Sequence, residues 1–193
     1  MKRAFDFTCS LIAVIILLPL FALLSLIILI DDGKPVLFRQ QRVGRNNEVF
    51  SIYKFRTMKN NTGNVATAQL KNSDEFITRS GRFFRKTSLD ELPQLFNILK
   101  GDMSFVGPRP LIPEEEEIRQ LRNEKGVYAV RPGMTGLAQI NGRDNLDMVQ
   151  KTEYDLQYIK NMSFFNDIKI LFKTVFVVLS GKDIVEGAGQ EKR

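Results

Sequence analysis

Residues 11–30 read LIAVIILLPLFALLSLIILI and contain no charged side chain. A helix of about 20 residues is about 30 Å long, which is the thickness of the hydrocarbon core of a bilayer. Pro19 stands near the middle of this run. Because proline removes one helical hydrogen bond and clashes with the preceding turn, we expect a kink at this position. The segment therefore predicts a kinked helix that enters a membrane.

The charges on the two flanks of this segment bear on its topology. Lys2 and Arg3 precede it, and a strongly basic stretch with one acid, Glu48, follows it between positions 34 and 59. The basic residues of that stretch are Lys34, Arg39, Arg42, Arg45, Lys54, Arg56 and Lys59. Basic flanks favour the cytoplasm, so a re-entrant helix, which enters and leaves by the same face, satisfies both flanks. A straight spanning helix stays an equal alternative from these residues alone. A cleaved signal peptide is disfavoured, because no A-x-A-like site precedes Asp31.

The composition excludes several kinds of catalytic site. The chain of 193 residues has no histidine and one cysteine, Cys9. This excludes Ser–His and Cys–His pairs, histidine-liganded zinc and intramolecular disulfides. An enzyme built from this chain must therefore use carboxylates, lysines or hydroxyls.

The positive charge of the chain points to anionic partners. Lys and Arg total 28 and Asp and Glu total 22, which gives a formal net charge of +6. Basic residues beside Tyr53 and Phe55 keep a nucleic-acid binder open as a rival interpretation. An anionic lipid bilayer and phosphorylated substrates explain the same charge together with the apolar segment, so we expect no nucleic-acid partner.

Two stretches after the apolar segment predict a β-hairpin. Residues 34–41 and 48–58 are typical of short strands, and the turn-forming residues 44–47 join them. In the second strand Lys54 and Arg56 share a face with Phe50 and Ile52. Solvated charges on an edge strand and contacts to a substrate are both open for this pair.

A pair of adjacent carboxylates, Asp90 and Glu91, follows the basic residues Arg85 and Lys86. Residues 87–101 predict a helix that begins near Asp90 and is closed by Gly101. One interpretation is structural, because Ser88 to Glu91 fits the S-x-x-E capping box. The other is chemical: a helix N-terminus with nearby arginines attracts phosphate, so one carboxylate would attack phosphorus and the other would hold Mg²⁺. The residues alone leave both open.

The rest of the chain supplies loops and helices around this pair. Residues 107–110, Gly-Pro-Arg-Pro, predict a stiff extended element, and residues 131–136 and 141–143 predict binding loops. Residues 146–160 predict a helix. The apolar residues 164–179 are typical either of a core helix or of a helix that lies in the membrane interface.

Three motifs carry a resemblance to a known family. They are KFRTM (54–58), RKTSLDELPQLFNILKGDMSFVGPRP (85–110) and RPGMTGLAQINGR (131–143). In this order they resemble the bacterial sugar transferases, and more narrowly the small monotopic polyprenyl-phosphate phosphoglycosyl transferases.

The resemblance implies a reaction and roles for individual residues. Such enzymes transfer a sugar-1-phosphate from a UDP-sugar to undecaprenyl phosphate and release UMP, as the first membrane step of capsule, exopolysaccharide or glycoconjugate assembly. Asp90 would be the nucleophile that forms a covalent aspartyl intermediate, and Glu91 would be the Mg²⁺ ligand. The expected substrate contacts are Lys54, Arg56, Arg85, Pro108, Arg109, Pro110, Arg131 and Arg143.

The resemblance also implies an architecture. We expect a helix-rich α/β cytoplasmic domain with a re-entrant membrane helix and interfacial amphipathic helices, on the cytoplasmic face of a bacterial inner membrane. The expected division is 1–33 for the membrane helix, 34–186 for the catalytic domain and 187–193 for a flexible tail. The family breaks its membrane helix at a Ser-Pro pair, whereas here Leu18 precedes Pro19. The sequence leaves open the sugar and the oligomeric state, a homodimer included.

Overall fold

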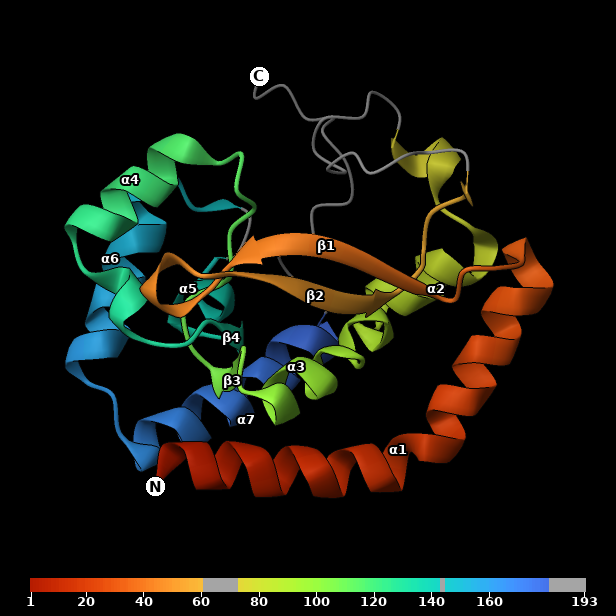
Figure 1. Ribbon diagram of the computed structural model, residues 1–193, viewed down its shortest axis with the longest axis horizontal. Helices are drawn as coiled ribbons and strands as arrows, with labels where there is room; N and C mark the ends of the chain where they lie inside the picture. Colours follow the sequence, from red (N-terminus) through yellow and green to blue (C-terminus); the bar gives the residue numbers. More distant parts are fainter. Residues whose placement is uncertain (61–72, 143–144, 181–193) are drawn as a thin grey trace.

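The apolar N-terminal segment forms one long helix, α1 (Lys2–Asp32), in the computed structural model, which describes residues 1–60, 73–142 and 145–180. Figure 1 shows that α1 bends sharply near its middle and follows two sides of the domain. Pro19 lies within the helix, so the predicted kink is confirmed. By length and composition α1 is able to cross a membrane. The helix ends at Gly33, whose φ of 72° suits a residue without a Cβ atom.

The remaining elements form a helix-rich α/β domain, as predicted. They are β1 (Leu37–Val43), η1 (Arg45–Asn47), β2 (Val49–Phe55), η4 (Ser73–Phe76), α2 (Arg79–Lys86), η5 (Leu89–Glu91), α3 (Gln94–Lys100), β3 (Ser104–Val106), α4 (Glu116–Glu124), η6 (Val127–Ala129), β4 (Gly133–Thr135), α5 (Leu137–Ile140), α6 (Met148–Lys160) and α7 (Phe164–Ser180), where η denotes a 3₁₀ helix. The predicted tail, residues 187–193, lies outside the described residues.

The described residues contain two small sheets. The predicted hairpin is confirmed: β1 and β2 are antiparallel, with Gln40 opposite Ile52 and Arg42 opposite Phe50. Strands β3 and β4 are parallel, with Ser104 opposite Gly133. At the end of β1 the amide of Val43 donates to the carbonyl of Leu111 at 2.8 Å, which joins the hairpin to the segment after β3.

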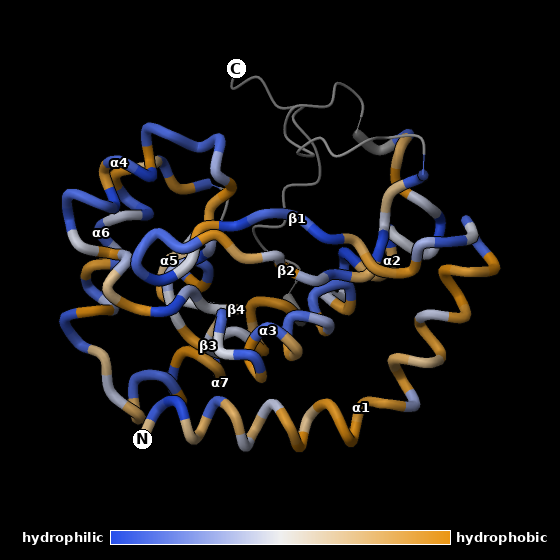
Figure 2. The backbone as a smooth tube through the Cα atoms, viewed as in Figure 1, coloured by the Kyte–Doolittle hydropathy of each residue, from blue (hydrophilic) through white to orange (hydrophobic). Residues whose placement is uncertain are grey.

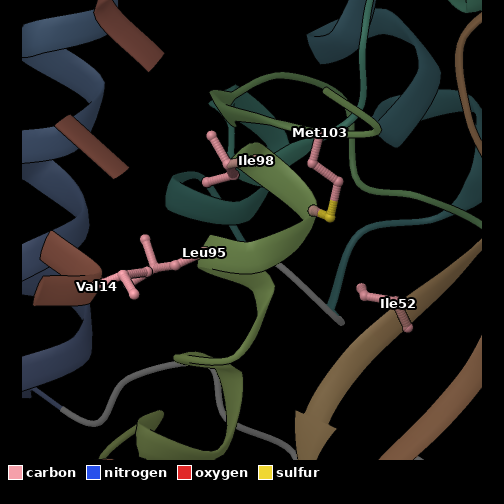
Figure 3. Close-up of a cluster of buried hydrophobic side chains, with 5 residues drawn as sticks. All are labelled: Val14, Ile52, Leu95, Ile98 and Met103. Atoms are coloured by element: carbon pink, nitrogen blue, oxygen red, sulfur yellow. The ribbon is translucent and has the colours of Figure 1, made fainter. Parts of the chain in front are cut away.

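Each half of α1 contributes to a different hydrophobic core. Val14 in the first half packs with Ile52, Leu95, Ile98 and Met103, and Figure 3 shows Val14 pointing toward Leu95 of α3. In the second half a separate cluster comprises Leu24, Ile28, Phe55 and Phe84. Full burial of such a side chain contributes about 1.5–3 kcal/mol. Both halves of α1 therefore contribute buried side chains to the domain.

Charged residues at the two ends of α1 attach it to α3 and to α2. Arg3 Nη2 donates to the carbonyl of Leu99 at 2.7 Å, near the C-terminal end of α3. Asp31 Oδ2 accepts from the amide and the hydroxyl of Ser80 at 2.9 and 2.7 Å, in the first turn of α2. A cation at the C-terminal end of a helix and an anion at the N-terminal end of another both suit the helix dipoles.

The outer face of α1 is apolar and exposed. Ile16 is 69% exposed and Ile30 is 78% exposed, and the orange colour of α1 in Figure 2 contrasts with the blue of β1 and α4. Helix α7 has both characters that its sequence allowed, because Ile170 is buried whereas Phe165 and Phe176 are exposed. These faces have the composition of surfaces that contact lipid.

A buried ion pair connects α4 to α6. Arg122 Nη2 and Asp155 Oδ2 are 2.6 Å apart, with side-chain exposures of 2% and 1%. Burial raises the pKa of Asp155 to about 6, although Arg122 opposes this rise. Because removing one member leaves the other charge buried without a partner, we expect this pair to be sensitive to single substitution.

Asp155→Ala should lower the free energy of unfolding by about 3–5 kcal/mol, because it leaves the Arg122 guanidinium buried and unpaired. Circular-dichroism unfolding of the detergent-solubilised protein measures this loss. The double variant Arg122→Met/Asp155→Leu should recover part of the stability, since it leaves no buried charge. A loss below about 1 kcal/mol in Asp155→Ala would show that the pair is effectively solvated.

Candidate active site

The two adjacent carboxylates lie on a short 3₁₀ turn, η5, between α2 and α3. The predicted helix start near Asp90 is wrong, because α3 begins at Gln94 with Pro93 in the capping position. The predicted capping box is also wrong, because Ser88 makes no side-chain capping bond. Ser88 instead adopts a left-handed conformation with φ 55°, which is uncommon for a residue with a Cβ atom. The predicted closure of α3 by Gly101 is confirmed, with φ 96°.

Glu91 forms an ion pair with the hairpin. Lys54 Nζ lies 2.8 Å from Glu91 Oε1, and both side chains are mostly buried. Lys54 is on β2, so the hairpin brings a cation to the carboxylate turn. The alternative of solvated charges on an edge strand is therefore wrong for this lysine.

Asp90 is a buried carboxylate in a field of mixed charges. Its residue exposure is 9%, and burial raises its pKa to about 6. The positive charges of Lys54 and Arg85 oppose this rise, whereas the negative charge of Glu91 adds to it. Arg85 itself donates from Nε to Thr57 Oγ1 at 2.9 Å. The structure thus brings the predicted contacts Lys54 and Arg85 to the carboxylate pair.

The predicted Pro-Arg-Pro element forms a rigid loop after β3. The carbonyl of Pro108 accepts from the amide of Gly133 at 2.8 Å, and the carbonyl of Arg109 accepts from Arg122 Nη1 at 2.7 Å. The carbonyl of Pro110 accepts from Arg42 Nη1 at 3.3 Å. All three carbonyls are engaged, and the two prolines fix their own φ angles, so the Arg109 side chain starts from a fixed backbone.

The close approach of two backbones at this loop requires glycine. A Cβ atom on Gly107 would lie 2.4 Å from the carbonyl oxygen of Arg131. The loop and β4 therefore pack at backbone distance, and the RPGMTG motif supports the Pro-Arg-Pro loop.

Two other predicted contacts, Arg56 and Arg131, have hydrogen-bond partners at helix ends. Arg56 Nη2 donates to the carbonyls of Asp32 and Gly33 at 2.9 and 2.7 Å, at the C-terminal end of α1. Arg131 Nε donates to the carbonyl of Gly101 at 2.7 Å, at the end of α3. Both guanidinium groups bind carbonyls at helix ends. The last predicted contact, Arg143, lies outside the described residues.

Sequence reasoning did not single out Arg42, Arg122 or Asp155. The Arg122–Asp155 pair holds the Arg109 carbonyl, and no motif joins two residues so far apart in the chain. Arg42 lies just beyond the predicted strand 34–41, and the pairing of β1 with β2 puts it on the same face as Phe50 and Lys54.

The carboxylate pair fits a Mg²⁺ ion that arrives with a phosphate ligand. Asp90 and Glu91 supply hard oxygen donors, and Mg²⁺ usually takes one or two carboxylates together with substrate phosphates. Among the described residues there is no cluster of three acidic, histidine or cysteine side chains, so a cage made of protein ligands is absent from that part of the chain. Because Glu91 Oε1 accepts from Lys54, the ion would have to share this carboxylate with the lysine.

Comparison with known proteins identifies the relatives of this chain. The family model described as bacterial sugar transferase matches residues 1–181. The undecaprenyl-phosphate galactose phosphotransferase of Salmonella typhimurium is 45% identical over 93% of this chain, and the undecaprenyl-phosphate glucose phosphotransferase of Komagataeibacter xylinus is 44% identical over 90%. The uncharacterized sugar transferase EpsL of Bacillus subtilis is 40% identical over 95%.

These relatives differ in length. The match spans 40% of the Salmonella protein and 35% of the Komagataeibacter protein, but 90% of EpsL. The chain therefore corresponds to a part of the first two relatives and to nearly all of the third.

The ionisation of Asp90 should be measurable directly. Carboxyl ¹³C NMR of aspartate-labelled protein in micelles should show a titration with a midpoint near pH 6 that is absent from Asp90→Asn. Lys54→Met removes a positive charge that favours the ionised carboxylate, so it should move this midpoint to higher pH.

Arg39→Gln is the matched control for this titration, because Arg39 lies on the same hairpin but is exposed. It should leave the Asp90 midpoint unchanged. A midpoint near pH 4 in the unsubstituted protein would show that Asp90 is solvated and would contradict the buried site.

Proposed function

Because the chain belongs to the bacterial sugar transferase family, we propose that it transfers a sugar-1-phosphate from a UDP-sugar to undecaprenyl phosphate and releases UMP. The observation that carries this proposal is the buried Asp90–Glu91 turn with Lys54 at 2.8 Å. Two relatives are named for sugar phosphotransfer to undecaprenyl phosphate. The product would start exopolysaccharide, capsule or other glycoconjugate assembly.

The proposed reaction has two displacement steps at one phosphorus atom. A carboxylate oxygen of Asp90 attacks the β-phosphorus of the donor and forms a new P–O bond. The bond from this phosphorus to the oxygen that bridges to the α-phosphate breaks, and its electron pair leaves with UMP. A phosphate oxygen of undecaprenyl phosphate then attacks the same phosphorus, which frees the Asp90 carboxylate and yields a sugar-diphosphate lipid.

The neighbouring side chains have distinct tasks in this scheme. Burial removes water from the Asp90 carboxylate, and the charges of Lys54 and Arg85 keep a substantial ionised fraction available for attack. The same cations would stabilise negative charge on the transferred phosphoryl group. Mg²⁺, held by Glu91 and the donor diphosphate, would neutralise further phosphate charge when bound.

The contacts of the N-terminus support a re-entrant topology for α1. Lys2 Nζ lies 2.5 Å from Asp167 Oδ2 on α7, and Asp167 Oδ1 accepts from the Tyr158 hydroxyl at 2.8 Å. Arg3 contacts α3 directly. A straight span would place these basic residues on the opposite side of the membrane from their partners. We infer that both ends of α1 face the cytoplasm at a bacterial inner membrane, with α7 in the interface.

The reaction predicts UMP release that depends on Asp90. The purified protein, with Mg²⁺ and undecaprenyl phosphate, should release UMP from at least one of UDP-glucose, UDP-galactose and their N-acetylamino forms. A panel is needed because relatives of nearly equal identity are named for different sugars. Asp90→Asn should lower the rate by on the order of 10³-fold or more, since the nucleophile is lost.

Intact-protein mass spectrometry separates this mechanism from its rivals. Incubation with the UDP-sugar alone should add one sugar-phosphate to the unsubstituted protein and none to Asp90→Asn. Glu91→Gln should chiefly weaken the dependence on Mg²⁺. An adduct that persists in Asp90→Asn would reassign the nucleophile, and cellular function retained by Asp90→Asn would favour a non-catalytic scaffold.

The topology predicts where an engineered thiol is accessible. In a Cys9→Ser background, a cysteine at the exposed position Ala4 preserves the Lys2–Asp167 pair. An impermeant thiol reagent should leave it unlabelled in intact spheroplasts and label it after lysis. Glu124→Cys on α4 is the matched catalytic-domain control and should behave identically. Labelling of position 4 before lysis would refute the re-entrant helix.

A further inference from the structure

Thr57 follows β2 closely, and its backbone is fixed against the start of α2. Its carbonyl accepts from the amide of Thr78 at 3.0 Å, and the amide of Lys59 donates to the carbonyl of Phe76 at 2.8 Å. Two backbone hydrogen bonds therefore join the chain after β2 to the chain before α2. They set the position of Thr57 relative to this helix.

Helix α2 approaches Thr57 at backbone distance because position 81 is a glycine. A Cβ atom on Gly81 would lie 2.3 Å from the carbonyl oxygen of Thr57. Gly81 and Arg85 are four residues apart, so they lie on one face of the helix. The face of α2 that packs on the Thr57 backbone therefore also carries Arg85.

The Thr57 hydroxyl holds the guanidinium of Arg85 at its Nε atom. Arg85 Nε donates to Thr57 Oγ1 at 2.9 Å, and Thr57 is only 7% exposed. This bond distinguishes Arg85 from other arginines of the domain. Four of them have a buried Nε atom without a hydrogen bond: Arg42, Arg56, Arg119 and Arg122. A bond at Nε fixes the plane of a guanidinium group, and this plane sets the direction of its N–H donors.

The positive charge of Arg85 acts on the carboxylate turn. It favours the ionised form of Asp90 and so lowers the pKa of Asp90, against the rise that burial causes. Lys54, three residues before Thr57, has the same effect. Residues 54–57 therefore place both cations, Lys54 by its own side chain and Arg85 through the Thr57 hydroxyl.

We propose that Thr57 is a positioning residue for phosphoryl transfer, whose hydroxyl fixes the plane of the Arg85 guanidinium beside the carboxylate turn. The inference rests on the proposed function and adds to it a residue that acts through Arg85. Donors that are already oriented stabilise the charge of the transition state without rearranging. Without the hydroxyl, Arg85 keeps its charge but loses its fixed plane, so kcat should fall more than the KM for the donor changes.

Thr57→Val tests this role with little change in shape, because it replaces the hydroxyl with a methyl group. The probe is the UDP-sugar that releases the most UMP in the panel above. Thr57→Val should lower kcat by about tenfold and leave the KM for this donor within about twofold. Thr57→Ser retains the hydroxyl and should keep kcat within about twofold of the unsubstituted protein. A loss in Thr57→Ser as large as in Thr57→Val would overturn the role of the hydroxyl.

Thr152→Val is the matched control, because it removes another buried threonine hydroxyl. Thr152 is 2% exposed, and its hydroxyl donates to the carbonyl of Met148 at 2.8 Å within α6. This variant should keep kcat within about twofold. A loss equal to that of Thr57→Val would mean that any buried hydroxyl has this effect, and it would overturn the inference.

A double-mutant cycle tests whether Thr57 acts through Arg85. In an Arg85→Gln background the guanidinium is gone, so Thr57→Val should change kcat by less than about twofold. Losses that multiply in the double variant would show that Thr57 acts independently of Arg85, which contradicts the inference.

The contact itself is measurable without turnover. Spectra of the ¹⁵N-arginine-labelled protein in micelles should contain a slowly exchanging Nε–H signal that is absent from Arg85→Gln. Exchange of this signal with solvent should be at least about tenfold faster in Thr57→Val, which lacks the acceptor. Gly81→Ala, which forces α2 away from the Thr57 carbonyl, should have the same effect. Unchanged exchange in Thr57→Val would overturn the inference.

The outcomes separate this inference from the proposed function. UMP release at an unchanged rate in Thr57→Val would overturn the inference and leave the reaction intact. No UMP release by the unsubstituted protein would instead overturn the proposed function. Thr57→Val retains the backbone bonds of Thr57, so the test does not depend on the folding of Gly81→Ala.

Discussion

The bend in helix α1 is the constraint on which the rest of the structure depends. A straight apolar helix of this length would contact the domain along one line, but the bent helix packs its first half on α3 and its second half on Phe84 of α2. The turn with Asp90 and Glu91 lies between these two helices. The apolar helix that is able to cross a membrane by its length and composition therefore also packs against both neighbours of the carboxylate pair.

The carboxylate turn balances two opposing electrostatic effects. Burial of Asp90 favours its neutral form, and the adjacent Glu91 adds like charge, whereas Lys54 and Arg85 favour the ionised form. Lys54 is far in sequence from the other three residues, so the balance exists only when β2 packs against η5. A buried carboxylate that stays partly ionised at neutral pH suits attack on phosphorus, since it is desolvated but still charged.

The sequence predicted the elements better than the pairing of their side chains. The apolar run, Pro19, the turn residues 44–47 and Gly101 each act locally, and they predicted the bent helix, the hairpin and the end of α3. The capping box does not form, because α3 starts only at Gln94, after Pro93. The Glu91 carboxylate instead pairs with Lys54, which is 37 residues away in the chain. Arg56 and Arg131, predicted as substrate contacts, also donate to carbonyls at helix ends, and no local pattern reveals those bonds.

The β1–β2 hairpin holds two cations, Lys54 and Arg42, at a fixed spacing on one face. Its inner face carries Lys54 near the end of α1 and Arg42 near the far end, and a strand keeps such side chains at a fixed spacing. At one end Arg56 ties β2 to the carbonyls that close α1, and at the other Val43 and Arg42 tie β1 to the segment after β3. Because both ends are attached, the hairpin cannot shift its register without breaking one of them. The spacing of Lys54 and Arg42 is therefore held by attachments to the end of α1 and to the segment after β3.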